Sequence, residues 1–100
     1  MLACGDGSLY SGMTNDVARR LKEHQAGRGG RYTRAHLPVR LAAVWAYPSR
    51  SRAAAAEAAL KRLRRKAKLR LVHRRLPFQG ADFAERILTR IQSEPDVTEL

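Results

Sequence analysis

The first eleven residues constrain the fold of this chain more than any other segment. Residues 5–7, Gly-Asp-Gly, tolerate the positive φ of a tight turn, and apolar residues lie on both sides of them. This pattern predicts a β-hairpin that ends near Ser11. Only Met1 to Cys4 precede the turn, so the first strand is barely long enough to pair. We therefore expect a small sheet with a truncated first strand and a short edge.

The rest of the chain alternates between helical and strand patterns. Helical spacing and capping residues predict helices over residues 16–25, about 50–65, 66–73 and 82–92, and the apolar run 41–47 predicts a third strand. Residues 27–34 indicate a flexible basic loop. The order β-β-α-β-α-α-α predicts an α+β fold, a small antiparallel three-stranded sheet packed with three to four helices. We expect one domain over 1–75, a C-terminal helix within 76–94 that packs on it or extends it, and a polar tail over 95–100.

Positive charge is concentrated in the middle of the chain. The net charge is +11, and residues 25–80 hold 15 Lys and Arg residues and one acid, Glu57. A strong positive potential favours polyanionic partners, and the excess of Arg over Lys, twelve to three in this stretch, suits bidentate contact with phosphate. A GC-rich codon bias would enrich arginine as well. A basic ribosome-associated protein also fits the charge, but not the motif spacing described below.

The remaining composition excludes several classes of protein. A single cysteine, Cys4, excludes an intramolecular disulfide and indicates a reducing, cytoplasmic location. No apolar run approaches the roughly 20 residues that cross a bilayer, and no signal-peptide pattern begins the chain. We expect no membrane partner and no small-molecule cofactor.

Several motifs occur together in the order of one known family. The second strand ends in Leu-Tyr-Ser-Gly at residues 9–12, a capped helix follows with Arg20 and His24, and the basic loop and the segment 48–63 come next. In this combination residues 1–75 resemble the GIY-YIG nuclease domain. The resemblance is to its small stand-alone bacterial members, which are related to the nuclease domain of the excision-repair endonuclease.

The resemblance implies an endonuclease that hydrolyses phosphodiester bonds in DNA, including branched or damaged structures, with one Mg²⁺ or Mn²⁺ ion. Tyr10, Arg20 and His24 match the family's catalytic residues, and Glu57 matches its metal ligand. In such sites the tyrosine or a metal-bound water handles proton transfer, the arginine steadies the phosphate, and the glutamate holds the metal.

Independent of the family, a helical wheel separates Arg20 from its neighbour Arg19. At about 100° per residue, Val17, Leu21 and His24 form one stripe, Arg20 flanks it, and Arg19 points to the other side. An arginine at the margin of a core is positioned to bind phosphate.

Each candidate also has a purely structural interpretation. The Arg20 side chain could extend along the helix surface with its charged end in water. The role of Glu57 could be limited to an i,i+4 ion pair with Lys61. Tyr10 and His24 could be packing residues of the strand and the core.

The basic loop is the predicted nucleic-acid contact. Its glycines leave room for a nucleic-acid backbone to come close, its arginines can neutralise phosphates, and its tyrosine can stack on a base. The residues concerned are Arg28, Arg31, Tyr32 and Arg34.

The chain departs from the family in its first motif. The family places a tyrosine on the first strand, and residues 1–4, Met-Leu-Ala-Cys, lack it. We expect that the start codon was assigned too late. The alternatives are a natural truncation and a catalytically impaired domain that binds nucleic acid without cutting it.

Overall fold

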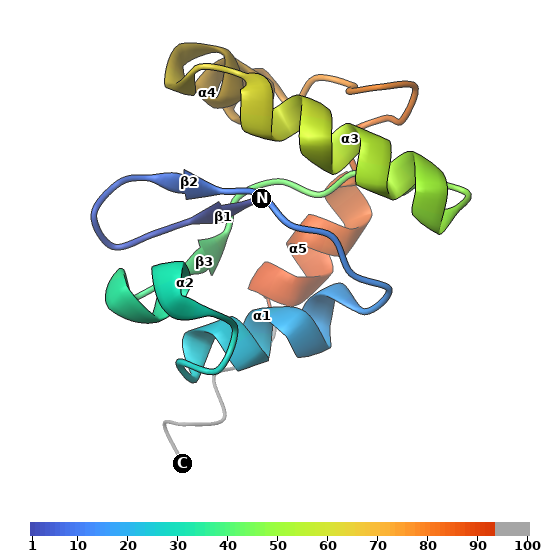
Figure 1. Cartoon of the computed structure of the whole chain (residues 1–100). Coiled ribbons are helices and arrows are strands. Elements are labelled where there is room, and N and C mark those ends of the chain that lie inside the picture. Colours follow the sequence, from blue (N-terminus) through green and yellow to red (C-terminus); the bar gives the residue numbers. More distant parts are fainter. Residues whose placement is uncertain (94–100) are drawn as a thin grey trace.

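The computed structural model describes residues 1–93, which form an α+β fold around a three-stranded antiparallel sheet (Figure 1). The strands are β1 (Leu2–Ala3), β2 (Leu9–Tyr10) and β3 (Arg40–Leu41), in the spatial order β2-β1-β3. Leu2 pairs with Tyr10 on one side and with Leu41 on the other. The short first strand is therefore the centre of the sheet, and our expectation that it forms a short edge was wrong.

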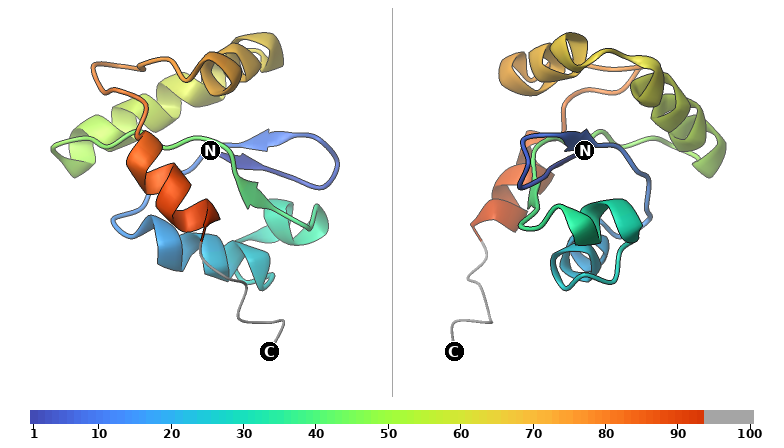
Figure 2. Two further views of the ribbon diagram at one scale, coloured as in Figure 1. Left: turned by 180° about the vertical axis from the view of Figure 1, so that it is seen from behind. Right: turned by 60° about the vertical axis from the view of Figure 1, so that its left-hand side comes forward.

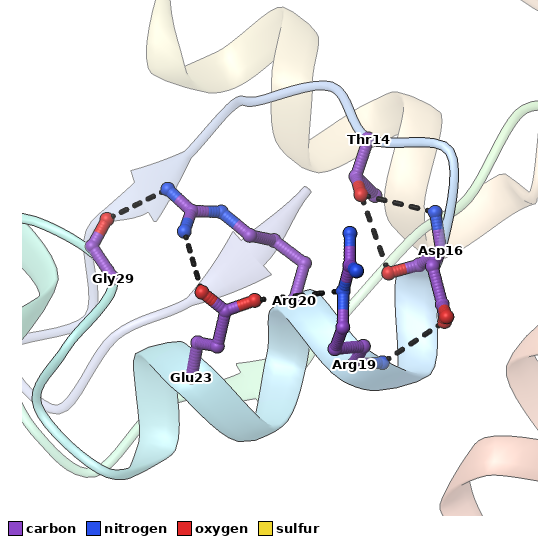
Figure 3. A network of polar contacts seen from close by, with 6 residues as sticks. All are labelled: Thr14, Asp16, Arg19, Arg20, Glu23 and Gly29. Carbon is purple, nitrogen blue, oxygen red and sulfur yellow. Dashed lines mark hydrogen bonds and ion pairs between the residues drawn. The ribbon is translucent and has the colours of Figure 1, made fainter.

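The first helix, α1 (Val17–Gln25), begins and ends where its sequence signals lie. The Asp16 side chain accepts a hydrogen bond from the Arg19 backbone N–H at 3.1 Å, which satisfies a free donor of the first turn (Figure 3). Gly27, with φ of 80°, follows the helix end. The helix buries Leu21 and His24, two of the three residues of its predicted stripe.

The segment predicted to be a flexible loop contains a short helix, α2 (Arg31–Ala35). The glycines before it gave no helical signal, and only its tertiary contacts explain why it is ordered. Arg20 donates to the Gly29 carbonyl, and the buried Thr33 hydroxyl bonds to His24. Both contacts attach the segment to α1.

The regular third strand is shorter than predicted, but backbone pairing continues beyond it. Ala42 N–H and Ala43 N–H donate to the Met1 carbonyl, and the Met1 amine donates to the Ala43 carbonyl at 2.8 Å. Residues 42–44 are buried, and Trp45 forms an isolated bridge to Phe83. The apolar run 41–47 therefore pairs with two different segments and does not form one long strand.

Three further helices complete the described chain. They are α3 (Arg50–Arg62), capped by the Ser49 side chain, α4 (Arg65–Arg74) and α5 (Glu85–Gln92). The last begins three residues later than expected, because Phe83 forms the bridge to Trp45 and Ala84 N–H donates to the Val44 carbonyl. With α2, residues 1–93 contain five helices and not three to four.

The helices form two layers around the strands. Figures 1 and 2 show α1 and α2 on one side of the sheet, α3 and α4 on the other, and α5 running between the two pairs. One core contains Leu41 of β3, Val44 just after it, Leu60 of α3, and Leu88 and Ile91 of α5. None of the helices in residues 1–93 is long and apolar enough to cross a membrane. The predicted tail over 95–100 lies outside the described residues.

Candidate active site

The four predicted site residues line one cleft. A depression of about 910 Å³ lies between the end of β2, α1 and α3, and its lining includes Tyr10, Arg20, His24 and Glu57. These residues come from three elements and are as much as 47 positions apart in the chain (57 minus 10). The fold therefore brings together an aromatic hydroxyl, a guanidinium, an imidazole and a carboxylate.

Arg20 is held in place by two contacts, which Figure 3 shows. One terminal nitrogen, Nη2, donates to the Gly29 carbonyl at 2.9 Å, and the other, Nη1, lies 3.2 Å from Oε2 of Glu23. Its side chain is 39% exposed, against 66% for Arg19, as the helical wheel predicts. A guanidinium has five N–H donors. Those that the two contacts leave free can bind an anion in the cleft.

His24 is buried, with 3% of its surface exposed. Its Nδ1 lies 2.6 Å from the hydroxyl oxygen of Thr33, and Gly29 packs so closely on the ring that a Cβ there would overlap it. Burial lowers the pKa of His24, the charge of Arg20 lowers it further, and Glu23 opposes both effects. The imidazole is therefore neutral at neutral pH.

Tyr10 reaches the cleft from β2. Its ring centroid lies 5.5 Å from that of His24 and 5.9 Å from that of Tyr32. The phenol oxygen forms no hydrogen bond with residues 1–93. Its hydroxyl can thus act as donor or acceptor toward a group in the cleft.

Glu57 faces the cleft from α3 and also forms the i,i+4 pair that its spacing allows. The Nζ atom of Lys61 lies 3.3 Å from its carboxylate, and the two side chains are 56% and 24% exposed for Lys61 and Glu57. Such a pair contributes only about 0.3 kcal/mol, so it does not compete strongly with another ligand.

The donor set fits a single hard cation. Residues 1–93 contain no group of three His, Cys, Asp or Glu side chains that could hold a metal ion by themselves. Mg²⁺ takes oxygen ligands and usually keeps several waters, so one carboxylate together with substrate phosphate is a sufficient set. Glu57 supplies that carboxylate.

The predicted nucleic-acid contacts lie on the segment around α2. The side chains of Arg28, Arg31 and Arg34 are exposed and form no ion pair within residues 1–93. Tyr32 is 42% exposed but engaged: its hydroxyl donates to Ser8 at 2.6 Å, and its ring stacks on His36 at 4.3 Å. The tyrosine thus ties α2 to the hairpin.

Sequence reasoning missed the residues that support the site. Gly29 and Thr33 contact Arg20 and His24 from nine positions further along the chain. Neither carries a local signal, because a glycine or threonine in a glycine-rich loop has no distinctive spacing. The contacts appear only when the loop folds onto α1.

The sequence of the chain is similar to those of known proteins. The sequence profile of the GIY-YIG catalytic domain matches residues 1–70. The chain belongs to the GIY-YIG family. This GIY-YIG protein is 53% identical over 75 residues to a UPF0213 protein of Streptococcus sanguinis, covering 75% of this chain and 86% of the relative. It is 49% identical over 72 residues to the UPF0213 protein BH0048 of Halalkalibacterium halodurans, covering 72% and 77%.

A solved structure is also similar to this GIY-YIG protein. The solution NMR structure of UPF0213 protein BH0048 from Bacillus halodurans shares 49% identity, with a TM-score of 0.47 and coverage of 72% and 77% of the two chains. Family membership places the chain among nuclease domains, whose substrate is nucleic acid and which typically use a divalent metal.

Proposed function

We propose that this chain is a metal-dependent endonuclease that hydrolyses phosphodiester bonds in DNA, including branched or damaged structures. One observation carries the proposal: Tyr10, Arg20, His24 and Glu57, from β2, α1 and α3, line the same cleft. We assign the activity to a unit of residues 1–75, with residues 76–93 packing on it or extending it.

Arg20 binds the scissile phosphate. Its guanidinium is a cationic donor and is already oriented by the Gly29 carbonyl and by Glu23. A group held before the reaction does not have to reorganise as negative charge grows on the phosphoryl oxygens. The stabilisation is therefore directed at the transition state.

Tyr10 and His24 act on the attacking water and the phosphate. The Tyr10 hydroxyl can accept a hydrogen bond from the attacking water and so orient it, since it has no other partner within residues 1–93. The neutral imidazole of His24 lies beside it and adds a second polar group to the same part of the cleft.

Glu57 is the ligand for the metal. A Mg²⁺ or Mn²⁺ ion would supply Lewis-acid polarisation of the phosphate. The carboxylate itself carries the only acidic charge in the cleft lining that residues 1–93 form, so it also attracts the cation into a strongly basic region. The exposed arginines around α2 bind the flanking DNA backbone.

Cleavage assays test the proposal. Duplex, branched and damaged DNA are incubated with the chain and Mg²⁺, Mn²⁺ or a chelator. We expect metal-dependent cleavage that falls about 100-fold or more in Arg20→Ala and in Glu57→Gln. Arg19→Ala is the matched control, because it removes a charge one position away on the exposed side of α1, and it should keep nearly full activity.

Two results would contradict this function. Cleavage that survives both Arg20→Ala and Glu57→Gln would show that another site is responsible. Salt-sensitive DNA binding without cleavage of any substrate would instead support the second candidate, a catalytically impaired nucleic-acid-binding module of the same fold.

A further inference from the structure

His24 has a buried partner that the proposed reaction does not use. Its Nδ1 lies 2.6 Å from the hydroxyl oxygen of Thr33, and the two residues are 3% and 1% exposed. Either group can donate in principle, because neutral imidazole carries its proton on one of two nitrogens and a hydroxyl both donates and accepts. The direction of this bond decides which nitrogen faces the substrate as a donor.

The environment of Thr33 settles the direction. Within residues 1–93 its hydroxyl has one hydrogen-bond partner, Nδ1 of His24. If Nδ1 carried the proton, the hydroxyl would accept and its own hydrogen would have no acceptor in a place closed to water. Leaving a buried donor unpaired is costly. If Thr33 donates to Nδ1, both groups are satisfied.

The other edge of the imidazole opens to the cleft. Gly29 packs against the atoms Nδ1, Cγ and Cε1, so this edge of the ring is enclosed. The Nε2 atom forms no hydrogen bond within residues 1–93 and is not among their fully buried, unpartnered polar atoms, while His24 lines the cleft. Nε2 is therefore the nitrogen that a substrate can reach.

We propose that Thr33 is a positioning residue that holds His24 as the Nε2–H tautomer, so that the histidine presents a hydrogen-bond donor to the cleft. Building on the proposed function, this makes His24 a donor to an anionic oxygen of the phosphate. It also excludes the neutral histidine as general base, because the nitrogen with the free lone pair is the one occupied by Thr33. Burial keeps the imidazole neutral, which the tautomer requires.

His36 provides the opposite case in the same molecule. Its Nδ1 lies 2.6 Å from the Tyr32 carbonyl oxygen, which can only accept. The Nδ1 of His36 must therefore carry a proton, whether the ring is neutral or charged. The two histidines should differ in the protonation of the same nitrogen.

Nuclear magnetic resonance of the full, ¹⁵N-labelled chain tests the proposal. A two-bond ¹H–¹⁵N correlation spectrum near neutral pH distinguishes protonated from unprotonated ring nitrogens, and His24→Gln and His36→Gln assign the signals. We expect an unprotonated Nδ1 in His24 and a protonated Nδ1 in His36. A protonated Nδ1 in neutral His24 would overturn the proposal, whether or not Thr33 variants fold.

Two substitutions then test Thr33 itself. Thr33→Val keeps the shape but removes the donor, so His24 should show a mixture of tautomers, whereas Thr33→Ser should restore the wild-type pattern. In cleavage assays kcat of Thr33→Val should fall about tenfold with little change in KM, and Thr33→Ser should recover most of it. An unchanged tautomer in Thr33→Val would refute the role of Thr33.

The spectrum needs no DNA and no metal, so it separates this proposal from the proposed function. A chain that shows the expected tautomers but cuts no DNA refutes the nuclease assignment alone. A chain that cuts DNA with His24 in the other tautomer refutes the positioning role alone.

Discussion

Substitution of Gly29 by alanine should test how tightly the loop is fitted to α1. Gly29 is buried, and its carbonyl accepts a hydrogen bond from Arg20. A Cβ added at Gly29 would point at the His24 imidazole. Its φ lies outside the left-handed region, so an alanine meets no backbone strain there. The effect of the new Cβ is therefore steric, and its three nearest contacts are all atoms of the His24 ring.

The size of the effect follows from the room around the ring. His24 cannot move aside without breaking its bond to the buried Thr33, and overpacking of this kind costs about 1–3 kcal/mol. For a domain of this length each kcal/mol lowers Tm by about 4–8 °C, so Gly29→Ala should lower it by roughly 4–24 °C.

Urea unfolding provides the assay, followed by fluorescence of Trp45, the single tryptophan. Gly12→Ala is the matched control, because its Cβ would meet only an ordinary contact with Tyr10 at 3.5 Å. We expect that variant to stay within about 0.5 kcal/mol of wild type.

A double-mutant cycle isolates the clash. In a His24→Ala background the overlapping ring is gone, so adding the Cβ at Gly29 should cost much less than in the wild type. An equal loss of stability in both backgrounds would refute the steric argument and would point to a change in the loop backbone.

Three further predictions concern the same region. Asp16→Ala should lower stability by about 1 kcal/mol in urea unfolding, because it removes the side-chain cap of α1; Asp16→Asn, which can still accept the bond, should cost less. Burial, and then the charge of Arg20, lower the pKa of His24, so the unfolded chain binds this proton more readily than the folded one. Stability should therefore fall as the pH drops below about 6.5, and urea midpoints measured across this range should show a smaller fall in His24→Gln. Replacing the exposed loop arginines by glutamine should make binding to duplex DNA less sensitive to salt. The slope of the logarithm of the binding constant against the logarithm of the salt concentration should fall in magnitude by about 0.9 for each phosphate that is no longer neutralised. An unchanged slope would show that other residues bind the phosphates. These arginines are Arg28, Arg31 and Arg34.

The sequence predicted what depends on local spacing. Thr14, Asn15 and Asp16 are all capping candidates for α1, and Ser49 and Ser51 for α3. Asp16 and Ser49 form the caps, and each binds an N–H only three residues along the chain. The different exposure of Arg19 and Arg20 followed from the 3.6-residue period. The fold class was also correct, since the hairpin, the third strand and the helices have separate local signals.

What the sequence did not predict depends on contacts between distant residues. Helix α2 follows a glycine-rich stretch with low helix propensity, and it is attached to α1 by Thr33 and Gly29. After β3 the backbone of Ala42 and Ala43 pairs with Met1, and the Val44 carbonyl accepts from Ala84. The apolar pattern of residues 42–44 could not show this change of partner, because a buried segment is apolar whichever segment it pairs with.

One short segment joins the proposed DNA contacts to the proposed site. The backbone of Gly29 orients Arg20 and encloses the ring of His24, and Arg28 and Arg31 lie one and two residues away from it in the chain. A loop that bound DNA only through flexible arginines would leave Arg20 and His24 unsupported. Because this loop folds onto α1, DNA held by its arginines would be fixed relative to the cleft. In the proposed function, the contacts that order the loop would therefore set the position of the phosphate relative to the groups proposed to act on it.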